Sequence, residues 1–179
     1  MYAGHSAVAL ALKGRNPEVA LLPLVFACFG PDWVDLVLMV LAPFDSTELY
    51  SHSIPAVVVG AAMAAGLMTL FGMPGARTVF VGWLLHWPAD LFTGLKPLFA
   101  AAPLVGLDLY HRPRADFLLE SAIVFVGTAI YLRAFPRTRT RSAIVMATAA
   151  MLVATQAAVD YTIVRTDRSR WQPSLATPR

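Results

Sequence analysis

Residues 51–93 read SHSIPAVVVGAAMAAGLMTLFGMPGARTVFVGWLLHWPADLFT. Two apolar runs, 54–72 and 77–93, are joined by a Gly-Met-Pro-Gly segment that predicts a tight turn. A helix needs about 20 predominantly apolar residues to cross the hydrocarbon core of a bilayer. We therefore expect an antiparallel pair of membrane helices. The two ends of this hairpin, which both carry histidine, then lie at the same side of the membrane.

Upstream of the hairpin the apolar segments are shorter. Residues 5–13 predict a helix that is too short to span and that stops at a cluster of breaker residues. The runs 18–30 and 33–42 are separated by a break that we place at Asp32. They predict one broken membrane helix or a re-entrant pair, with Asp32 and Asp35 on one face because of their i, i+3 spacing.

Downstream, 116–134 and 142–164 predict two further spans, and 94–115 predicts an ordered excursion at the membrane interface. Residues 1–164 then form a single membrane-embedded helical domain, followed by a disordered basic tail at 165–179. The predicted fold class is an all-α polytopic membrane bundle. It has about four spanning helices, together with a short N-terminal helix and broken or re-entrant helices.

The composition agrees with this class. Hydrophobic residues make up 58% of the 179 residues, charged residues only 14%, and the mean hydropathy is +0.62. These values are typical of a multi-pass membrane protein. Most of the arginines flank the last apolar segment, as in membrane anchoring, which argues against nucleic-acid binding. The single cysteine, Cys28, excludes a disulfide framework and a thiolate metal cluster.

A set of histidines and aspartates interrupts these apolar segments. An unpaired ionisable group in hydrocarbon is costly, so such residues usually face one another, a cavity or a metal. His86 and Asp90 are at i, i+4 and can share one ion, or they can simply satisfy each other by a hydrogen bond. The hairpin brings His52 level with this pair. The candidate metal ligands are His5, Asp32, Asp35, His52, His86 and Asp90.

Imidazole and carboxylate ligands without thiolate suit Zn²⁺, Mn²⁺ or Fe²⁺, and six ligands are enough for one or two ions. We expect a divalent metal cofactor, with Zn or Mn favoured. Asp32 or Asp35 is the candidate catalytic general base, because a carboxylate beside a cation stays ionised and can reach water. Glu120, near the start of a predicted span, is a candidate outer partner for a ligating histidine.

Several short motifs occur together in this chain: Gly4-His5, Pro31-Asp32-x-x-Asp35, Ser51-His52-Ser53 and His86-x-x-x-Asp90-Leu-x-Thr93. In order and spacing, residues 1–95 resemble the LexA-regulated inner-membrane family of suggested metal-dependent hydrolases. Val105-Gly106-Leu107-Asp108-Leu109-Tyr110 with Leu118-Leu119-Glu120 is also similar to a branch of small bacterial membrane proteins labelled permeases. The resemblance implies a bacterial inner-membrane location and the same six metal ligands.

The leading functional hypothesis is a membrane-bound metal-dependent hydrolase. Its substrate is an ester or phosphoester of a lipid-like or other small molecule, attacked by metal-activated water. Its expected partners are membrane lipids and that substrate. Two alternatives remain open. The same residues could form a cation or proton pathway in a small transporter, or they could only lock the helices of an accessory membrane protein together.

Overall fold

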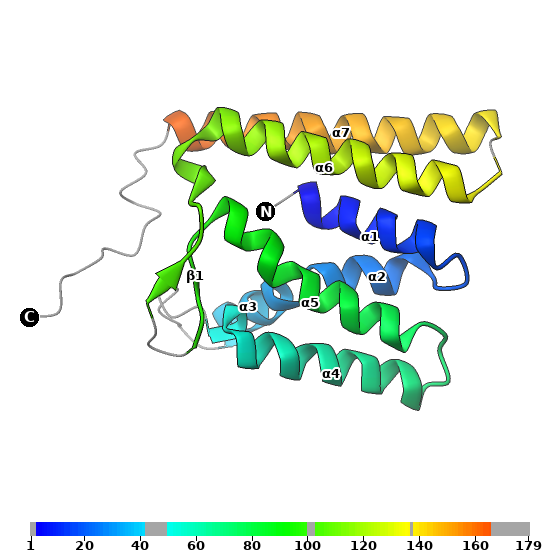
Figure 1. The fold of residues 1–179 in the computed structure, drawn as a ribbon, viewed down its shortest axis with the longest axis horizontal. Helices are drawn as coiled ribbons and strands as arrows, with labels where there is room; N and C mark the ends of the chain where they lie inside the picture. Colours follow the sequence, from blue (N-terminus) through cyan, green and yellow to red (C-terminus); the bar gives the residue numbers. More distant parts are fainter. Residues whose placement is uncertain (1–2, 42–49, 100–102, 137, 166–179) are drawn as a thin grey trace, which may run out of the picture.

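The computed structural model describes residues 3–41, 50–99, 103–136 and 138–165 (Figure 1). The described residues are almost entirely helical, which confirms the predicted all-α class. In chain order the elements are α1 (Ala3–Arg15), α2 (Leu21–Cys28), α3 (Gly30–Leu41), the 3-10 helix η1 (Tyr50–His52), α4 (Ile54–Leu70), α5 (Ala76–Thr93), β1 (Lys96–Pro97), β2 (Leu104–Val105), the 3-10 helix η2 (Leu109–His111), α6 (Pro113–Ala134) and α7 (Arg139–Arg165).

The predicted hairpin of two helices is confirmed as α4 and α5. The turn between them uses two glycines with positive φ, Gly72 (+62°) and Gly75 (+95°), a backbone conformation that other residues rarely adopt. A Cβ atom on Gly75 would lie 2.4 Å from Cγ2 of Val19, in the segment that joins α1 to α2. Gly75 therefore permits both the turn and its close packing.

The break between the two short apolar helices is confirmed, but its predicted position at Asp32 is wrong. The chain leaves α2 at Phe29, and α3 begins at Gly30 with Pro31 in its first turn. Proline suits a first helical turn because its missing N–H has no partner there in any case. The two helices meet at an angle of 66°, and Asp32 and Asp35 both belong to α3.

Among the described residues, two helices are long and apolar enough to cross a membrane: Pro113–Ala134, which is α6, and Arg139–Thr162 of α7. The bent α2–α3 pair gives a third if it counts as one broken span. Helix α4 is apolar but has only 17 residues, and polar residues interrupt α5. Length and composition thus support two or three spans, and the predicted number of about four remains a prediction.

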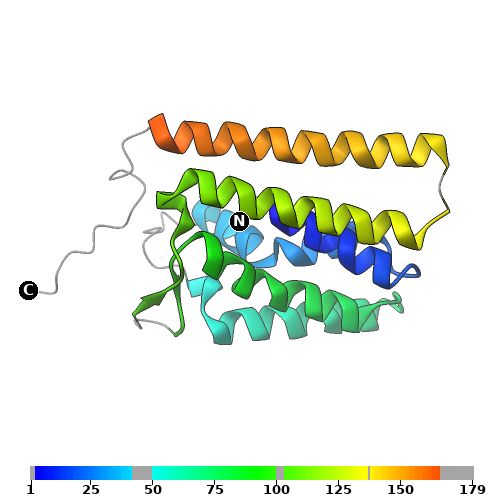
Figure 2. The same cartoon turned by 45° about the horizontal axis from the view of Figure 1, so that its top comes forward.

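The helices pack in layers. Helices α6 and α7 run antiparallel, α1 lies along α6, and α1 and α2 separate α6 from the α4–α5 hairpin (Figure 1). Figure 2 shows α7 outermost; it packs mainly against α6 and also contacts α1. Large apolar side chains such as Leu70, Leu118 and Met151 are exposed on the outer helices, as expected where a surface faces lipid.

Helix α1 lies unusually close to α6. A Cβ atom on Gly127 of α6 would be 2.3 Å from the carbonyl oxygen of Ala7, and one on Gly14 of α1 would be 2.9 Å from the carbonyl oxygen of Ile130. Small residues let helix backbones approach in this way. The close contact fixes the start of α1, and hence His5, against the rest of the structure.

The predicted interfacial segment 94–115 contains the β1–β2 hairpin and η2. Residues 100–102 of this segment lie outside the described residues, as does most of the predicted basic tail, since α7 continues to Arg165. The backbone N–H of Leu107 donates a hydrogen bond to the carbonyl oxygen of Leu91 (2.7 Å), so the hairpin is fastened to the last turns of α5.

Candidate metal centre

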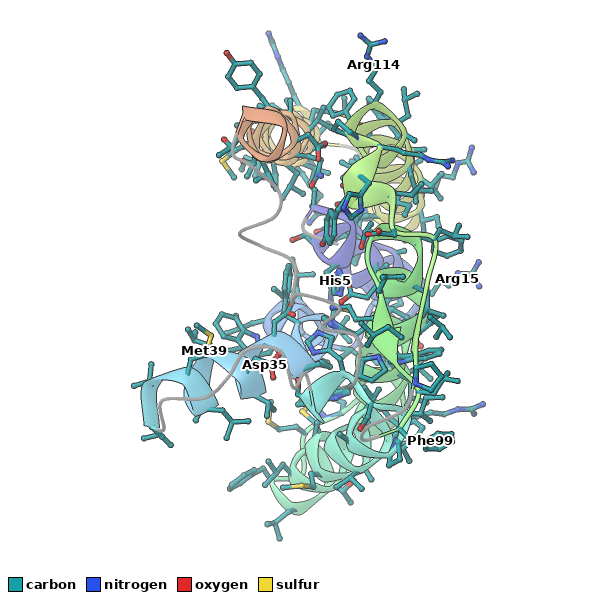
Figure 3. The ribbon with its side chains drawn as sticks, turned by 90° about the vertical axis from the view of Figure 1, so that its left-hand side faces the viewer. His5, Arg15, Asp35, Met39, Phe99 and Arg114 are labelled. Atoms are coloured by element: carbon teal, nitrogen blue, oxygen red, sulfur yellow. The ribbon has the colours of Figure 1, made fainter. Side chains whose placement is uncertain are left out.

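The structure brings the six predicted ligands close together. In Figure 3, His5 of α1 lies above Asp35 of α3. The six residues come from four elements: His5 from α1, Asp32 and Asp35 from α3, His52 from η1, and His86 and Asp90 from α5.

Asp90 is the centre of the arrangement. Its Oδ1 lies 3.6 Å from Nε2 of His5, while its Oδ2 lies 3.5 Å from Nε2 of His52 and 3.4 Å from Nε2 of His86. The Nε2 atoms of His52 and His86 are 3.1 Å apart. Three imidazole rings from three elements thus direct the same ring atom towards one buried carboxylate. The predicted alignment of His52 with His86 and Asp90 is confirmed.

The break between α2 and α3 orients His86. Carbonyl groups in the last turn of a helix have no partner within that helix. Cys28 ends α2, and its carbonyl oxygen lies 2.8 Å from Nδ1 of His86. Because a carbonyl only accepts, Nδ1 carries the proton, and Nε2 presents a free lone pair. A ligating histidine is usually held in this way, through its other ring nitrogen.

Asp35 orients the ring of His52, as the carbonyl group of Cys28 orients that of His86. Its Oδ2 lies 3.1 Å from Nδ1 of His52, on the side of the ring away from Nε2, and its Oδ1 accepts a hydrogen bond from the hydroxyl of Ser51. Both carboxylate oxygens are therefore engaged outside the point where the Nε2 atoms meet. This geometry is that of a residue that orients a ligand, whereas the sequence predicted Asp35 as a ligand itself.

Four of the six residues can hold one ion together. Ligand atoms from each lie within 4.8 Å of one another, and we call this set the His/Asp cluster: Asp32, His52, His86 and Asp90. Nitrogen and carboxylate ligands lie roughly 2.0–2.2 Å from Zn²⁺, so two ligands of one ion stand roughly 3–4 Å apart. The distances of 3.1–3.7 Å between members of the cluster agree with this spacing.

His5 provides a further test of fit. Its side chain is buried, and neither Nδ1 nor Nε2 has a hydrogen-bond partner among the described residues. A buried polar atom without a partner costs free energy. Nε2 of His5 faces Asp90 across 3.6 Å, and its ring packs edge-on against His86 with 4.1 Å between centroids. A cation shared with Asp90 would satisfy this ring, so the residues present fit the predicted metal.

The carboxylates also control the charge of His52. Burial alone would lower the pKa of His52, but hydrogen bonds to Asp32, Asp35 and Asp90 raise that pKa to about 9. In the absence of a cation, these carboxylates would therefore hold a proton on His52 near neutral pH. A cation bound by Nε2 would take the place of that proton.

Replacing Asp35 with asparagine tests its orienting part. We expect the affinity for Zn²⁺ or Mn²⁺ to fall on the order of 10–100-fold, because His52 loses the carboxylate that aligns it while its Nε2 remains. Equilibrium dialysis of the purified protein at buffered free metal measures this. The control is Asp108→Asn, since Asp108 also pairs with a histidine, the partly exposed His111. An unchanged affinity in Asp35→Asn, or a loss as complete as in Asp90→Asn, would contradict the assignment.

Glu120 supports the site from α6. It is fully buried, and its Oε2 accepts a hydrogen bond of 2.8 Å from the backbone N–H of Gly4. Gly4 precedes His5, and the first N–H groups of a helix have no partner within that helix. Glu120 thus fixes the start of α1 and acts on His5 through the backbone, whereas the sequence predicted a contact with a histidine side chain.

Two residues near the cluster were missed by sequence reasoning. The ammonium group of Lys96 lies 2.8 Å from Oδ2 of Asp90, and Oγ of Ser51 lies 2.8 Å from Nδ1 of His52. Ser51 stands beside His52 in the chain, so the Ser-His-Ser motif could have indicated it. Lys96 carried no such signal, because its position depends on how the β1–β2 hairpin folds back on α5.

Comparisons of the chain with protein-family models, curated proteins and solved structures find no match.

Proposed function

We propose that this protein is a multi-pass inner-membrane hydrolase that uses one or two divalent cations, Zn or Mn, to cleave an ester or phosphoester of a lipid-like substrate. The observation that carries the proposal is the convergence of three histidine Nε2 atoms on the carboxylate of Asp90. Two of these rings are also held through their Nδ1 atoms. The Nε2 atoms of these rings face one another and the carboxylates of Asp32 and Asp90 at the spacing of ligands of one ion.

Asp32 is the proposed general base. Its side chain is 45% exposed, and its Oδ1 lies 3.3 Å from Nε2 of His52, so it borders both the His/Asp cluster and open space. Asp35, the other candidate from the sequence, has both oxygens engaged by Ser51 and His52. When bound, a divalent cation supplies Lewis-acid chemistry and lowers the pKa of water. His52, His86 and Asp90 would hold that cation, and Oδ1 of Asp32 would accept the proton of the water.

The position of the cluster supports a lipid-like substrate. The candidate spans α6 and α7 and the exposed apolar side chains of the outer helices favour a membrane location. The cluster lies at the end of α5, next to the β1–β2 hairpin, since Lys96 of β1 contacts Asp90. A substrate that is confined to the membrane surface can reach such an end without leaving the lipid phase.

A turnover assay with the full chain in detergent tests the proposal. Suitable probes are p-nitrophenyl butyrate, bis-p-nitrophenyl phosphate and short-chain phospholipids, each with Zn²⁺ or Mn²⁺ and after chelation. We expect turnover that requires metal, that Asp32→Asn lowers on the order of 100-fold or more, and that His111→Ala leaves unchanged. Tightly bound metal without turnover of any probe would overturn the hydrolase proposal.

One observation favours the transporter alternative. Helices α6 and α7 bury a polar group that consists of Asp116, Glu120, Gln156 and Asp160. The amide of Gln156 donates to Asp116 (3.3 Å) and to Asp160 (3.2 Å). Ionisable residues inside membrane helices often mark ion or proton pathways. Metal-dependent flux into liposomes, without turnover of the probes above, would decide for transport.

A further inference from the structure

A cavity of about 470 Å³ lies beside the His/Asp cluster. Asp32 and Asp90 give it a polar wall, and Phe29, Trp33 and Leu36 give it an apolar wall. The cavity therefore brings two carboxylates of the His/Asp cluster and an apolar surface to the same space. A molecule that fits both walls has a polar head and an apolar tail.

Lys96 also lines this cavity, and it is the only basic residue among the described residues that do so. Its side chain is 13% exposed, and its Nζ donates to Oδ2 of Asp90 at 2.8 Å. A lysine ammonium is strongly hydrated, so it is seldom buried without an anionic partner. In the structure Asp90 is that partner.

The fold holds Lys96 in place. Lys96 pairs with Val105 across the β1–β2 hairpin, and Gly106 follows with a φ of +152°. A Cβ atom on Gly106 would lie 2.0 Å from the carbonyl oxygen of Gly94, so the hairpin folds back on the end of α5 as closely as backbone atoms allow. This backbone contact thus holds β1 against α5 and keeps the ammonium group of Lys96 next to Asp90.

The single negative charge of Asp90 cannot fully neutralise both a bound cation and the ammonium group of Lys96. When Asp90 ligates a divalent cation, its negative charge is shared with that cation, and the ammonium of Lys96 faces a second positive charge across the cavity. An anionic group between the two would be attracted to both. Phosphate esters have the oxygen atoms and the charge that lysine and divalent cations bind together.

The apolar wall continues out of the cavity. Leu36 lines the cavity and is 51% exposed, and the next turns of α3 expose Val37, Val40 and Leu41. Figure 3 shows α3 extending away from the other helices, with Met39 on its outer part. An acyl chain could follow this face from the cavity into the surrounding lipid.

From these contacts we propose that the cavity binds a lipid with a phosphate-containing headgroup, and that Lys96 is the residue that recognises the phosphate. This inference rests on the proposed function, because it assigns the substrate class of the same site. The phosphate lies between Lys96 and the cation held by the His/Asp cluster. The first part of the acyl chain lies against Trp33 and Leu36.

Calorimetric binding of three probes to the metal-loaded protein tests the inference: dihexanoyl phosphatidic acid, dihexanoylglycerol without phosphate, and inorganic phosphate. We expect Lys96→Gln to weaken phosphatidic acid binding on the order of 10–100-fold, as for a lost hydrogen bond to a charged group. Dihexanoylglycerol should bind both proteins equally weakly. Lys96→Arg should keep most of the affinity, and Lys13→Gln, which alters the other lysine of the chain, should keep all of it.

The outcomes separate this inference from the proposed function, since the affinity and the turnover are measured in separate experiments. Equal phosphatidic acid affinity in wild type and Lys96→Gln, both with full metal content, would overturn the role of Lys96 and leave the hydrolase proposal standing. Inorganic phosphate that binds as tightly as the lipid would overturn the lipid assignment. Lys96-dependent binding of phosphatidic acid without any turnover would support the inference while the hydrolase proposal fails.

Discussion

Replacing His86 with alanine is expected to remove the bound metal almost completely. His86 is buried at the centre of the His/Asp cluster, where its Nε2 lies 3.1 Å from Nε2 of His52 and 3.4 Å from Oδ2 of Asp90. The other described histidines are not expected to take its position, because His5 and His52 are held by their own elements and His111 pairs with Asp108. The affinity should fall by more than the roughly 10–100-fold that the loss of an orienting partner costs.

Metal content after dialysis at buffered free Zn²⁺ or Mn²⁺ measures this loss. The matched control is His111→Ala, because His111 is the fourth histidine of the chain, pairs with Asp108 and does not belong to the His/Asp cluster. His86→Gln, which keeps a polar side chain in the buried space, serves as a second variant, and size-exclusion chromatography checks that both are folded. Full metal content in folded His86→Ala would contradict the proposed site.

Replacing Gly127 with valine is expected to destabilise the protein strongly. The new Cβ atom would lie 2.3 Å from the carbonyl oxygen of Ala7 and 3.1 Å from its Cα, so the obstacle is the backbone of α1 and not a side chain that can rotate. Overpacking usually costs about 1–3 kcal/mol, and more where a backbone must move. Helix α1 must shift away from α6, and it carries His5 with it.

Labelling of the single cysteine measures the expected fall in the unfolding temperature. Cys28 is buried, so a thiol-reactive dye labels it only as the protein unfolds on heating in detergent. The control is Gly66→Ala on α4, where a new Cβ atom meets nothing within 4 Å. That variant should unfold at the wild-type temperature or above, since alanine favours a helix over glycine by about 0.8–1.0 kcal/mol. Equal unfolding temperatures for Gly127→Val and Gly66→Ala would contradict the proposed packing of α1 on α6.

Much of the fold could be predicted because apolar periodicity and breaker residues act locally. The turn at Gly72 and Gly75 defined the α4–α5 hairpin, and the hairpin then placed His52 beside His86 and Asp90 by geometry alone. The position of the α2–α3 break was missed by a few residues. Pro31 can either end one helix or begin the next, and only packing decides between the two.

The separate parts played by the carboxylates could not be predicted from spacing. Asp32 and Asp35 lie on one face of α3, which suggested two equivalent ligands, yet Asp32 approaches Nε2 of His52 and Asp35 approaches Nδ1. The difference depends on how the His52 ring is rotated, which is a tertiary property. Lys96 contacts Asp90 because Gly106 packs closely against Gly94. The local sequence pattern does not indicate that contact.

The central claim is that His52, His86 and Asp90 ligate one divalent cation. X-ray absorption spectroscopy at the edge of the bound metal, on the full chain loaded with Zn²⁺ or Mn²⁺, tests it most directly. The structure predicts the multiple-scattering signature of imidazole from at least two histidines, oxygen from carboxylate, and no sulfur. A first shell of oxygen alone, or one that contains sulfur from Cys28, would contradict the account.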